Sequence, residues 1–229
     1  MNLLDFIFPK RCVCCRKHGY YICEKCFAYL SFDTKPLCLF CDKPSFNSLT
    51  HPVCRKKFTI DGCFSAVSYN KTAKKLIYSF KYKPYLSDLK NLLSELFYES
   101  IIQKEMFMKL MGEGSWLIVP IPLSDSKLRK RGYNQAEILA FELSKRLNIP
   151  RKNLLKRVKD TKSQFKLTKK EREKNIKGAF SCNQKSVIRN QNVFLIDDVV
   201  TSGATLMEAS NILKRNGAKR VIGLTFARD

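Results

Sequence analysis

The chain has 229 residues, which suits one medium-sized domain with a small attachment. Its 43 Lys and Arg against 20 Asp and Glu give a formal charge of +23, which favours polyanionic partners, while 45% hydrophobic and 11% aromatic residues exclude a disordered chain. The longest uncharged run, residues 114–124, falls short of the ~20 apolar residues that a membrane span needs. Asp5 interrupts the apolar core that a signal peptide would need, so we expect a cytoplasmic protein.

The first feature along the chain is a series of cysteine pairs. Eight of the ten cysteines precede residue 60, and most are paired two residues apart. Thiolates at this spacing on a tight turn reach one Zn2+ at ~2.3 Å, whereas a redox-active pair usually accompanies a βαβ unit. Pairing neighbours predicts two structural zinc sites. Their ligands are Cys12, Cys15, Cys23 and Cys26 in the first, and Cys38, Cys41, His51 and Cys54 in the second.

Some of these ligands have alternative interpretations. A single histidine beside a proline is more often a surface residue, so the second Zn2+ depends on His51. Cys14 lies inside the first pair and would replace Cys15 under a different geometry, while Cys63 and Cys182 are expected as small buried residues. A segment with so few branched aliphatic residues needs the metal to fold. Zinc thiolates with free cysteines left over indicate a reducing compartment.

After residue 60 the pattern changes to alternating strands and helices. Apolar runs of strand length occupy residues 63–69, 116–122, 193–196 and 220–226. Helical periodicity occupies residues 72–82, 86–102, 134–147 and 205–216, with Gly217 as the last helix stop. Strands that are apolar throughout, with helices between them, predict a parallel sheet covered by helices on both faces. We therefore expect an α/β domain over residues 61–229 that follows a small zinc-binding domain over residues 1–60.

Residues 193–205, Val-Phe-Leu-Ile-Asp-Asp-Val-Val-Thr-Ser-Gly-Ala-Thr, carry the chemistry. A buried strand delivers Asp197 and Asp198 to its carboxyl end, and a turn then begins a helix with Thr201, Ser202, Gly203, Ala204 and Thr205. Amides at a helix N-terminus bind anions, small residues let a phosphate approach, and hydroxyls donate to it. The carboxylates would repel that phosphate, so they should face sugar hydroxyls, a metal or a positive centre. A ribose 5-phosphate meets both conditions, and the alternative is an ordinary capped helix with two loop acids.

This stretch resembles the phosphoribosyl diphosphate-binding motif of type I phosphoribosyltransferases. In that motif, four apolar residues precede two Asp, two further apolar residues and a small hydroxyl-rich turn. The resemblance implies a type I phosphoribosyltransferase-like sheet in which Asp197 and Asp198 hold the ribose hydroxyls and face the oxocarbenium-like transition state at C1. It also implies that residues 201–205 wrap the 5-phosphate and that Mg2+ accompanies the pyrophosphate.

A second resemblance extends over nearly the whole chain. Besides the cysteine pairs, the segments Val-Pro-Ile-Pro-Leu at 119–123, Arg-Lys-Arg-Gly-Tyr-Asn-Gln at 129–135 and Lys-Gly-Ala-Phe at 177–180 follow the order seen in the ComF family. Proteins of this family join a double zinc ribbon-like segment to a phosphoribosyltransferase-like domain. Two positions depart from the family pattern. His51 begins what would be the fourth Cys-x-x-Cys pair, which weakens the second zinc site, and Ser202 stands where Thr is common.

Further binding residues follow from the same resemblance. Arg131, Asn134 and Gln135 begin a helix and would orient the substrate, the alternative being a capping and loop-packing role. Lys81 is a weaker candidate for the phosphate site, with an exposed lysine as its alternative. The charged segment 157–180 would be a mobile lid over the site, or else a disordered insert.

The expected partners also follow from the resemblance and the charge. ComF relatives are tied to natural competence, in which incoming single-stranded DNA is handled in the cytoplasm. Basic clusters at 127–131 and 151–177 would release counterions from a nucleic acid, although a lysine-rich composition alone would give a similar charge. We therefore expect a protein that binds phosphoribosyl diphosphate or a related nucleotide with Mg2+, binds single-stranded DNA, and meets a competence helicase or recombination protein. The alternative is an active phosphoribosyltransferase of nucleotide or cofactor metabolism with no DNA role.

Overall fold

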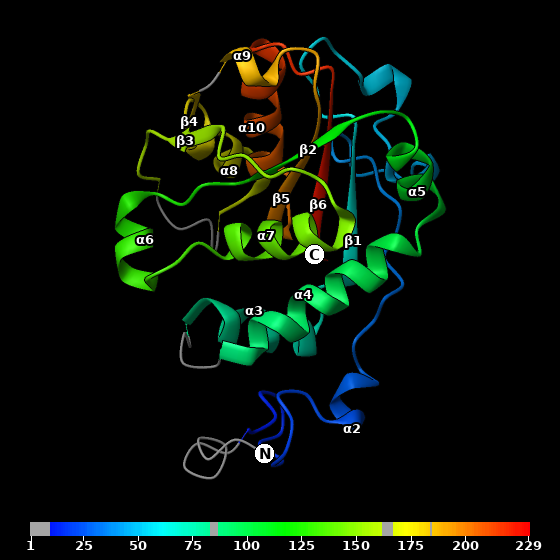
Figure 1. The fold of residues 1–229 in the computed structure, drawn as a ribbon, viewed down its shortest axis with the longest axis vertical. Coiled ribbons are helices and arrows are strands. Elements are labelled where there is room, and N and C mark those ends of the chain that lie inside the picture. Colours follow the sequence, from blue (N-terminus) through cyan, green and yellow to red (C-terminus); the bar gives the residue numbers. More distant parts are fainter. Residues whose placement is uncertain (1–9, 83–86, 162–166, 184) are drawn as a thin grey trace.

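The centre of the molecule is a sheet of parallel strands. The computed structural model describes residues 10–82, 87–161, 167–183 and 185–229 (Figure 1). Within these residues the sheet consists of β1 (Gly62–Ser68), β2 (Trp116–Pro120), β5 (Asn192–Val200) and β6 (Arg220–Arg228), in the order β1-β6-β5-β2. Each neighbouring pair is parallel, which confirms the predicted α/β fold.

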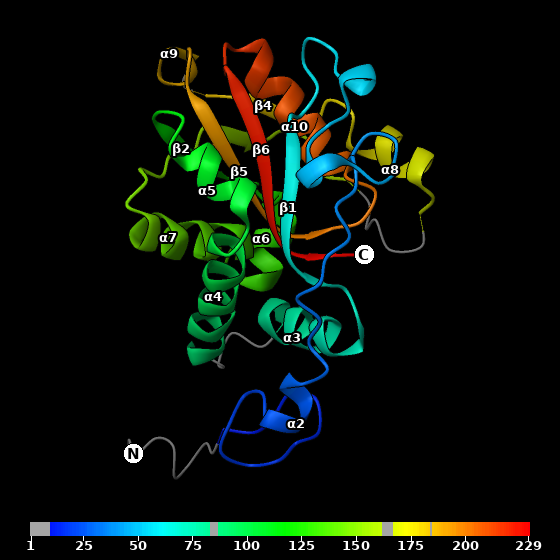
Figure 2. The ribbon, with the colours of Figure 1, turned by 90° about the vertical axis from the view of Figure 1, so that its right-hand side faces the viewer.

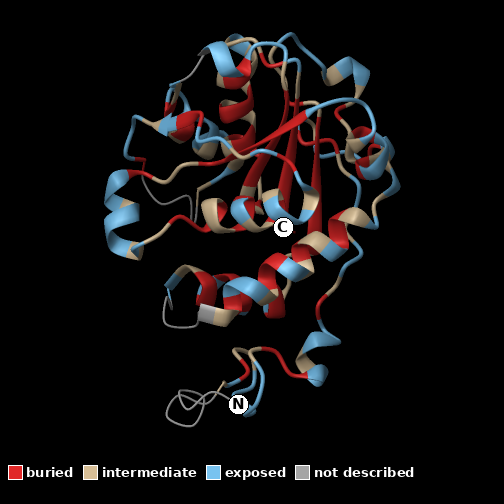
Figure 3. Ribbon diagram, in the orientation of Figure 1, coloured by how far each residue is buried: buried red, intermediate tan, exposed pale blue. Residues whose placement is uncertain are grey.

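Both faces of this sheet are buried, which explains why its strands are apolar at successive positions (Figure 3). Along β5, Phe194 and Ile196 lie in one hydrophobic core, and Val193 and Leu195 lie in the other. All four side chains are fully buried. A strand covered on both faces has no solvent-facing positions over this stretch, so the polar alternation of a half-exposed strand is absent.

Helices cover the two faces as separate groups (Figure 2). One face carries α3 (Lys71–Tyr82), α4 (Ser87–Ile102), α5 (Glu105–Met111) and α7 (Gln135–Leu147), whose apolar residues join the core that contains Phe194. The other face carries α10 (Ala204–Arg215) with α8 (Lys169–Ile176) beside it. The four predicted helices are confirmed close to their predicted bounds, and the predicted cover on both faces is confirmed as well.

Several short elements were not predicted from the sequence. Besides α5 and α8 they are α6 (Asp125–Arg131), α9 (Lys185–Ile188) and the antiparallel pair β3 (Leu155–Arg157) with β4 (Phe180–Cys182). Most are too short to show an apolar period, and α8 buries only Ile176. A capping box between Thr168 and Glu171 marks the start of α8.

The first part of the cysteine-rich region, residues 10–30, lies beside α3. It contains the short helix α2 (Glu24–Phe27) and lies at the end of the molecule that is farthest from β2 (Figure 2). Lys75 Nζ of α3 donates a hydrogen bond to the carbonyl of Cys14 at 2.8 Å. This part therefore rests on a helix rather than on the sheet itself.

The second part of the cysteine-rich region runs along the edge strand β1 (Figure 2). It contains the 3-10 helices η1 (Phe46–Ser48) and η2 (Pro52–Cys54). Leu39 and Ile60 of this part are fully buried in the core on the α10 side of the sheet. The predicted division at residue 60 stays a prediction, since this part packs directly on the sheet. Among the described residues, no helix has the length and apolar content that crossing a bilayer requires.

Candidate functional site

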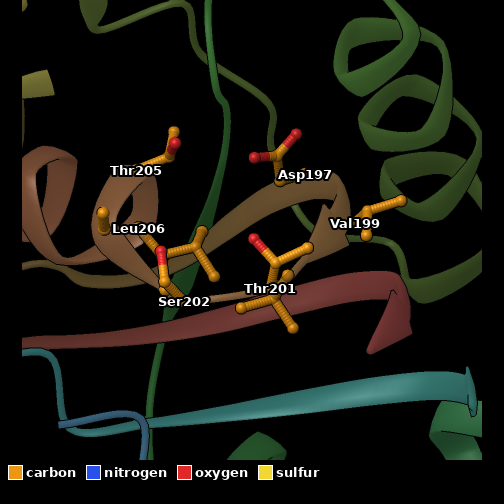
Figure 4. Close-up of a pocket in the computed structure, with 9 residues that line it drawn as sticks. Asp197, Val199, Thr201, Ser202, Thr205 and Leu206 are labelled. Carbon is orange, nitrogen blue, oxygen red and sulfur yellow. The ribbon is translucent and has the colours of Figure 1, made fainter. Parts of the chain in front are cut away.

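Strand β5 and the turn after it form a pocket at the carboxyl edge of the sheet (Figure 4). The pocket is lined by Asp197 and by residues 199–206. The strand does not end at Ile196 as predicted but continues to Val200, because β6 extends equally far and pairs with it up to Arg228. Ligands of parallel α/β sheets bind at this edge, so the pocket is where a ligand is expected.

The turn presents the N-terminus of α10 to the pocket. Gly203 has φ of +73°, in the left-handed region that favours glycine. The hydroxyl oxygen of Ser202 is buried and has no hydrogen-bond partner within the described part of the chain. Figure 4 shows Thr201 and Ser202 between Asp197, on the strand, and Thr205, on the helix. A buried hydroxyl beside the first amides of a helix suits an anionic acceptor.

The two carboxylates have different environments. Asp198 Oδ2 forms an ion pair with Lys81 Nζ of α3 at 2.9 Å, and both side chains are largely buried. Burial lowers the pKa of Lys81, but the charge and hydrogen bond of Asp198, together with the charge of Asp197, outweigh that effect and leave this pKa above its usual value. Asp197 accepts a hydrogen bond from the amide of Asp198 at 2.8 Å. Desolvation and then the charge of Asp198 raise the pKa of Asp197 to about 7.

The raised pKa of Asp197 reflects a buried carboxylate beside a second negative charge. Hydroxyl groups that donate to it, or a nearby cation, would favour its charged form. Lys81 pairs with the neighbouring Asp198, and its charge offsets the rise in the pKa of Asp197 only in part. Because the Lys81 side chain is 21% exposed and paired at the site, its alternative interpretation as an exposed surface lysine is wrong.

The polar side chains at the start of α7 form hydrogen bonds with neighbouring residues of the protein. Asn134 accepts from the amide two residues on at 3.1 Å and donates to the carbonyl of Ile121 at 2.9 Å. Arg131 donates to Gln135 Oε1 at 2.9 Å, and its guanidinium lies 5.2 Å from the centre of the Tyr82 ring. The Gln135 Nε2 is buried without a hydrogen-bond partner among the described residues. Capping and packing therefore account for Asn134, whereas a substrate-orienting role for Gln135 stays a prediction.

Three cations that sequence reasoning did not single out also lie near the pocket. Arg157 of β3 lies close enough to Asp197 to interact electrostatically with it, and its Nε is buried without a partner among the described residues. Burial and then repulsion from Arg157 lower the pKa of the Lys127 ammonium on α6. Arg172 of α8 donates to the hydroxyl of Thr201. In the sequence these cations belong to the two basic clusters, which favoured nucleic acid or a lid; gathered here, they favour a compact polyanion.

The segment predicted as a lid or a disordered insert is folded where the structure describes it. Within residues 157–180, α8 buries Ile176 in the core, and Arg172 reaches the turn. Residues 162–166 lie outside the described residues. A lid over the pocket stays a prediction.

Two clusters of metal ligands lie in the region before β1. The four ligand atoms of each cluster all lie within 4.8 Å of one another, and the clusters consist of Cys12, Cys15, Cys23 and Cys26, and of Cys38, Cys41, His51 and Cys54. A tetrahedron with ~2.3 Å bonds to zinc has its ligand atoms about 3.8 Å apart, so both sets fit Zn2+. The structure thus brings together the predicted neighbours, with Cys15 rather than Cys14 in the first cluster.

The histidine of the second cluster is oriented as a ligand. His51 Nδ1 lies 3.3 Å from Cys41 Sγ, while Nε2 lies 2.8 Å from the carbonyl oxygen of Pro44. A hydrogen bond from one ring nitrogen fixes the tautomer and leaves the other nitrogen to the metal. Burial would raise the pKa of Cys38, but backbone hydrogen bonds within the cluster outweigh it and lower the pKa to about 7. These contacts favour the ligand interpretation over the surface one.

Comparison with known proteins supports both parts of the chain. A phosphoribosyl transferase domain matches residues 132–229, and a double zinc ribbon domain matches residues 3–57, so the ribbon match and the two ligand clusters agree on structural zinc. The chain is 42% identical to competence protein F of Haemophilus influenzae over 45% of its length, which is 46% of that relative. It is 27% identical to competence protein ComFC of Bacillus subtilis, over 90% of this chain and 84% of the relative. It is also 28% identical to DNA utilization protein YhgH of Escherichia coli, over 93% of this chain and 94% of the relative.

Proposed function

We propose a function from the premise that the chain belongs to the ComF family, whose members join a double zinc ribbon to a phosphoribosyl transferase domain. On this premise the protein binds phosphoribosyl diphosphate, or a related nucleotide, with Mg2+, and acts in natural competence by handling single-stranded DNA in the cytoplasm. The observation that carries the binding part is the turn at residues 201–205, which lies at a helix N-terminus and follows two carboxylates at the end of β5.

The two halves of the site suit the two halves of a phosphoribosyl group. The turn, with the unpaired hydroxyl of Ser202, would hold the 5-phosphate. Asp197 and Asp198 would accept hydrogen bonds from the ribose hydroxyls, which favours the charged form of Asp197. Arg157 and Lys127 would attract a pyrophosphate group beside the ribose. Mg2+ usually binds through one or two carboxylates and the phosphates of its ligand, and it would neutralise charge on the pyrophosphate here.

The same geometry would support transfer chemistry. If pyrophosphate leaves C1 of the ribose, positive charge develops on the sugar, and carboxylates fixed beneath it stabilise that charge more in the transition state than in the ground state. Asp198 keeps its position through Lys81. The acceptor in such a reaction would be a nitrogen nucleophile.

Titration calorimetry of the zinc-loaded protein with phosphoribosyl diphosphate and Mg2+ tests the binding proposal. We expect a dissociation constant in the micromolar range, on the order of −8 kcal/mol of binding free energy. The double variant Asp197→Asn/Asp198→Asn should lose this binding, because the sugar hydroxyls lose their charged acceptors. Asp125→Asn, an exposed carboxylate on α6, serves as the matched control and should bind normally. A folded wild-type protein that gives no binding signal would refute the proposal.

The DNA part rests on the names of the relatives, which include competence and DNA utilization proteins, and on the charge of +23. Exposed aromatic rings that would stack on bases are also available: Tyr20, Tyr29 and Tyr78 are 62%, 73% and 58% exposed. Lys71 and Lys74 lie on the same helix as Tyr78 and are exposed as well.

Fluorescence anisotropy with labelled oligonucleotides tests the DNA proposal. We expect tighter binding to single strands than to duplex of the same length, with an affinity that falls as salt rises but persists at physiological ionic strength. The variant Tyr29→Ala/Tyr78→Ala should weaken binding to single strands by about 1–3 kcal/mol for each stacking contact that is lost. Equal affinity for single and double strands that vanishes at physiological salt would instead favour the alternative, a phosphoribosyltransferase of metabolism without a DNA role.

A further inference from the structure

The second metal cluster packs directly against the turn at residues 201–205, which we call the phosphate turn. Leu39 lies between the ligands Cys38 and Cys41, and its side chain is completely buried. A Cβ atom added to Gly203 would lie 2.5 Å from Leu39 Cγ and 2.6 Å from its Cδ1. Such distances are shorter than real carbon contacts allow, so Leu39 occupies the space that the missing side chain of Gly203 leaves open.

The same turn of the second cluster also holds the elements on either side of the pocket. Lys169 Nζ of α8 contacts Asp42 Oδ2 at 2.6 Å and the carbonyl oxygen of Phe40 at 3.3 Å. Arg228, in the last residue pair between β5 and β6, donates to the carbonyl of Leu37 at 3.2 Å. Helix α8 in turn reaches the phosphate turn through Arg172, which donates to Thr201. The residues around Leu39 therefore connect α8, the end of the sheet and the start of α10.

The physical consequence is that the turn has a rigid neighbour on the side facing away from the pocket. Gly203 adopts a left-handed conformation that costs glycine much of its freedom on folding, so contacts must hold it there. Leu39 has little freedom of its own once the metal binds, because the ligands Cys38 and Cys41 lie directly before it and two residues after it. Packing of Leu39 on Gly203 keeps the first amides of α10 aimed at one point, which is what a preorganised anion site requires.

We propose that Leu39 is a positioning residue for the phosphate turn. The second zinc ribbon, which is the part of the chain that holds Cys38, Cys41, His51 and Cys54, thereby forms part of the ligand site of the transferase domain. The ligand part of this inference rests on the proposed function; the structural part does not. The first ribbon, which packs on α3, has no such contact with Gly203 among the described residues.

The test compares Leu39→Ala with Phe40→Ala in the full-length, zinc-loaded protein. Both residues lie between the same two ligands, but Phe40 is 42% exposed whereas Leu39 is completely buried. We expect both variants to keep two zinc ions per chain. Leu39→Ala should bind phosphoribosyl diphosphate with Mg2+ at least tenfold more weakly, and the backbone amides of residues 203–207 should exchange with solvent faster than in wild type. Phe40→Ala should match wild type in both measurements.

A double-mutant cycle with Gly203→Ala measures the coupling between the two residues in ligand binding, which a general loss of stability would not change. The added methyl group meets Leu39 in the wild type, so Gly203→Ala should weaken binding by a larger factor there than in the Leu39→Ala background. Leu39→Met, which conserves volume, should bind within about threefold of wild type.

The outcomes separate the inference from the proposed function. Leu39→Ala with full zinc content, normal affinity and unchanged amide exchange would overturn the inference, and so would an equal loss in Phe40→Ala. If the wild-type protein does not bind phosphoribosyl diphosphate, the proposed function fails, while amide exchange at residues 203–207 still decides the role of Leu39. If Leu39→Ala does not fold, the milder Leu39→Val is measured by the same exchange experiment, and unchanged exchange there refutes the inference.

Discussion

Replacing Cys12 by Ser is expected to remove one zinc ion per chain and to unfold the first part of the cysteine-rich region. Apart from its thiols, this part buries only Ile22 and Leu30 among its described hydrophobic residues, which is far too little to fold without a metal. Structural zinc supplies about 10–16 kcal/mol of apparent binding free energy in zinc-finger peptides, so its loss outweighs any other change in this segment. Zinc analysis together with hydrogen exchange over residues 10–30 measures both effects.

Cys14→Ser is the matched control for this experiment. Cys14 lies between Cys12 and Cys15 but does not belong to the ligand cluster. Its replacement should leave two zinc ions per chain and unchanged exchange. Loss of zinc in Cys14→Ser, with full zinc in a Cys15→Ser variant, would show that Cys14 is the ligand instead. Protection of residues 10–30 in a zinc-free Cys12→Ser protein would contradict the expectation that the metal folds this part.

Replacing Lys81 by Met is expected to lower the free energy of unfolding by about 3 kcal/mol near neutral pH. The side chains of Lys81 and Asp198 are only 21% and 12% exposed, so removing the lysine leaves an uncompensated charge in a poorly solvated place. Chemical denaturation of the zinc-loaded protein measures the loss. A change below 1 kcal/mol would mean that water or another cation replaces Lys81 at little cost.

A second substitution separates loss of the ion pair from loss of packing. In Lys81→Met/Asp198→Asn the buried charge is gone, so most of the stability should return, to within about 1 kcal/mol of wild type. Lys74→Met, on the exposed face of the same helix, should change stability by less than about 0.5 kcal/mol. If the double variant remains as unstable as Lys81→Met, the methylene chain of Lys81 matters for packing rather than its charge.

The ion pair between Lys81 and Asp198 contributes to the stability of the protein and also to the geometry of the proposed ligand site. Lys81 ends a helix that follows β1, whereas Asp198 lies in β5, so the pair fixes α3 against the carboxyl edge of the sheet. It holds the Asp198 carboxylate in place beside the pocket, where a sugar or a developing positive charge would meet it. For Asp197, burial and the neighbouring carboxylate outweigh the nearby charges of Lys81 and Arg157 and raise its pKa to about 7. The two adjacent carboxylates are therefore prepared for different contacts with one ligand.

Local patterns in the sequence were sufficient for the main elements and for the chemistry-bearing segments. Thiols two residues apart can meet one metal ion because a single turn brings them together, and the clusters contain the predicted neighbours. The apolar runs at β2 and β5 predicted buried parallel strands, because a strand covered on both faces has no polar positions. The turn from Thr201 to Thr205 was also identified from a local pattern. Helix N-terminal amides, small residues and hydroxyl groups within one turn of the chain are the groups that bind a phosphate together.

Contacts between distant segments were decided only by the tertiary structure. Nothing near Lys81 in the sequence indicates Asp198, and nothing near Leu39 indicates Gly203, because these pairs meet only when α3 and the second ribbon pack against the sheet. The length of β5 was underestimated because its last residues are held by β6 rather than by their own apolar character. Spacing along the chain therefore determined which residues can meet around zinc, and it predicted which turn would bind phosphate. Packing of the sheet edge determined which cations, and which part of the zinc ribbon, lie beside them.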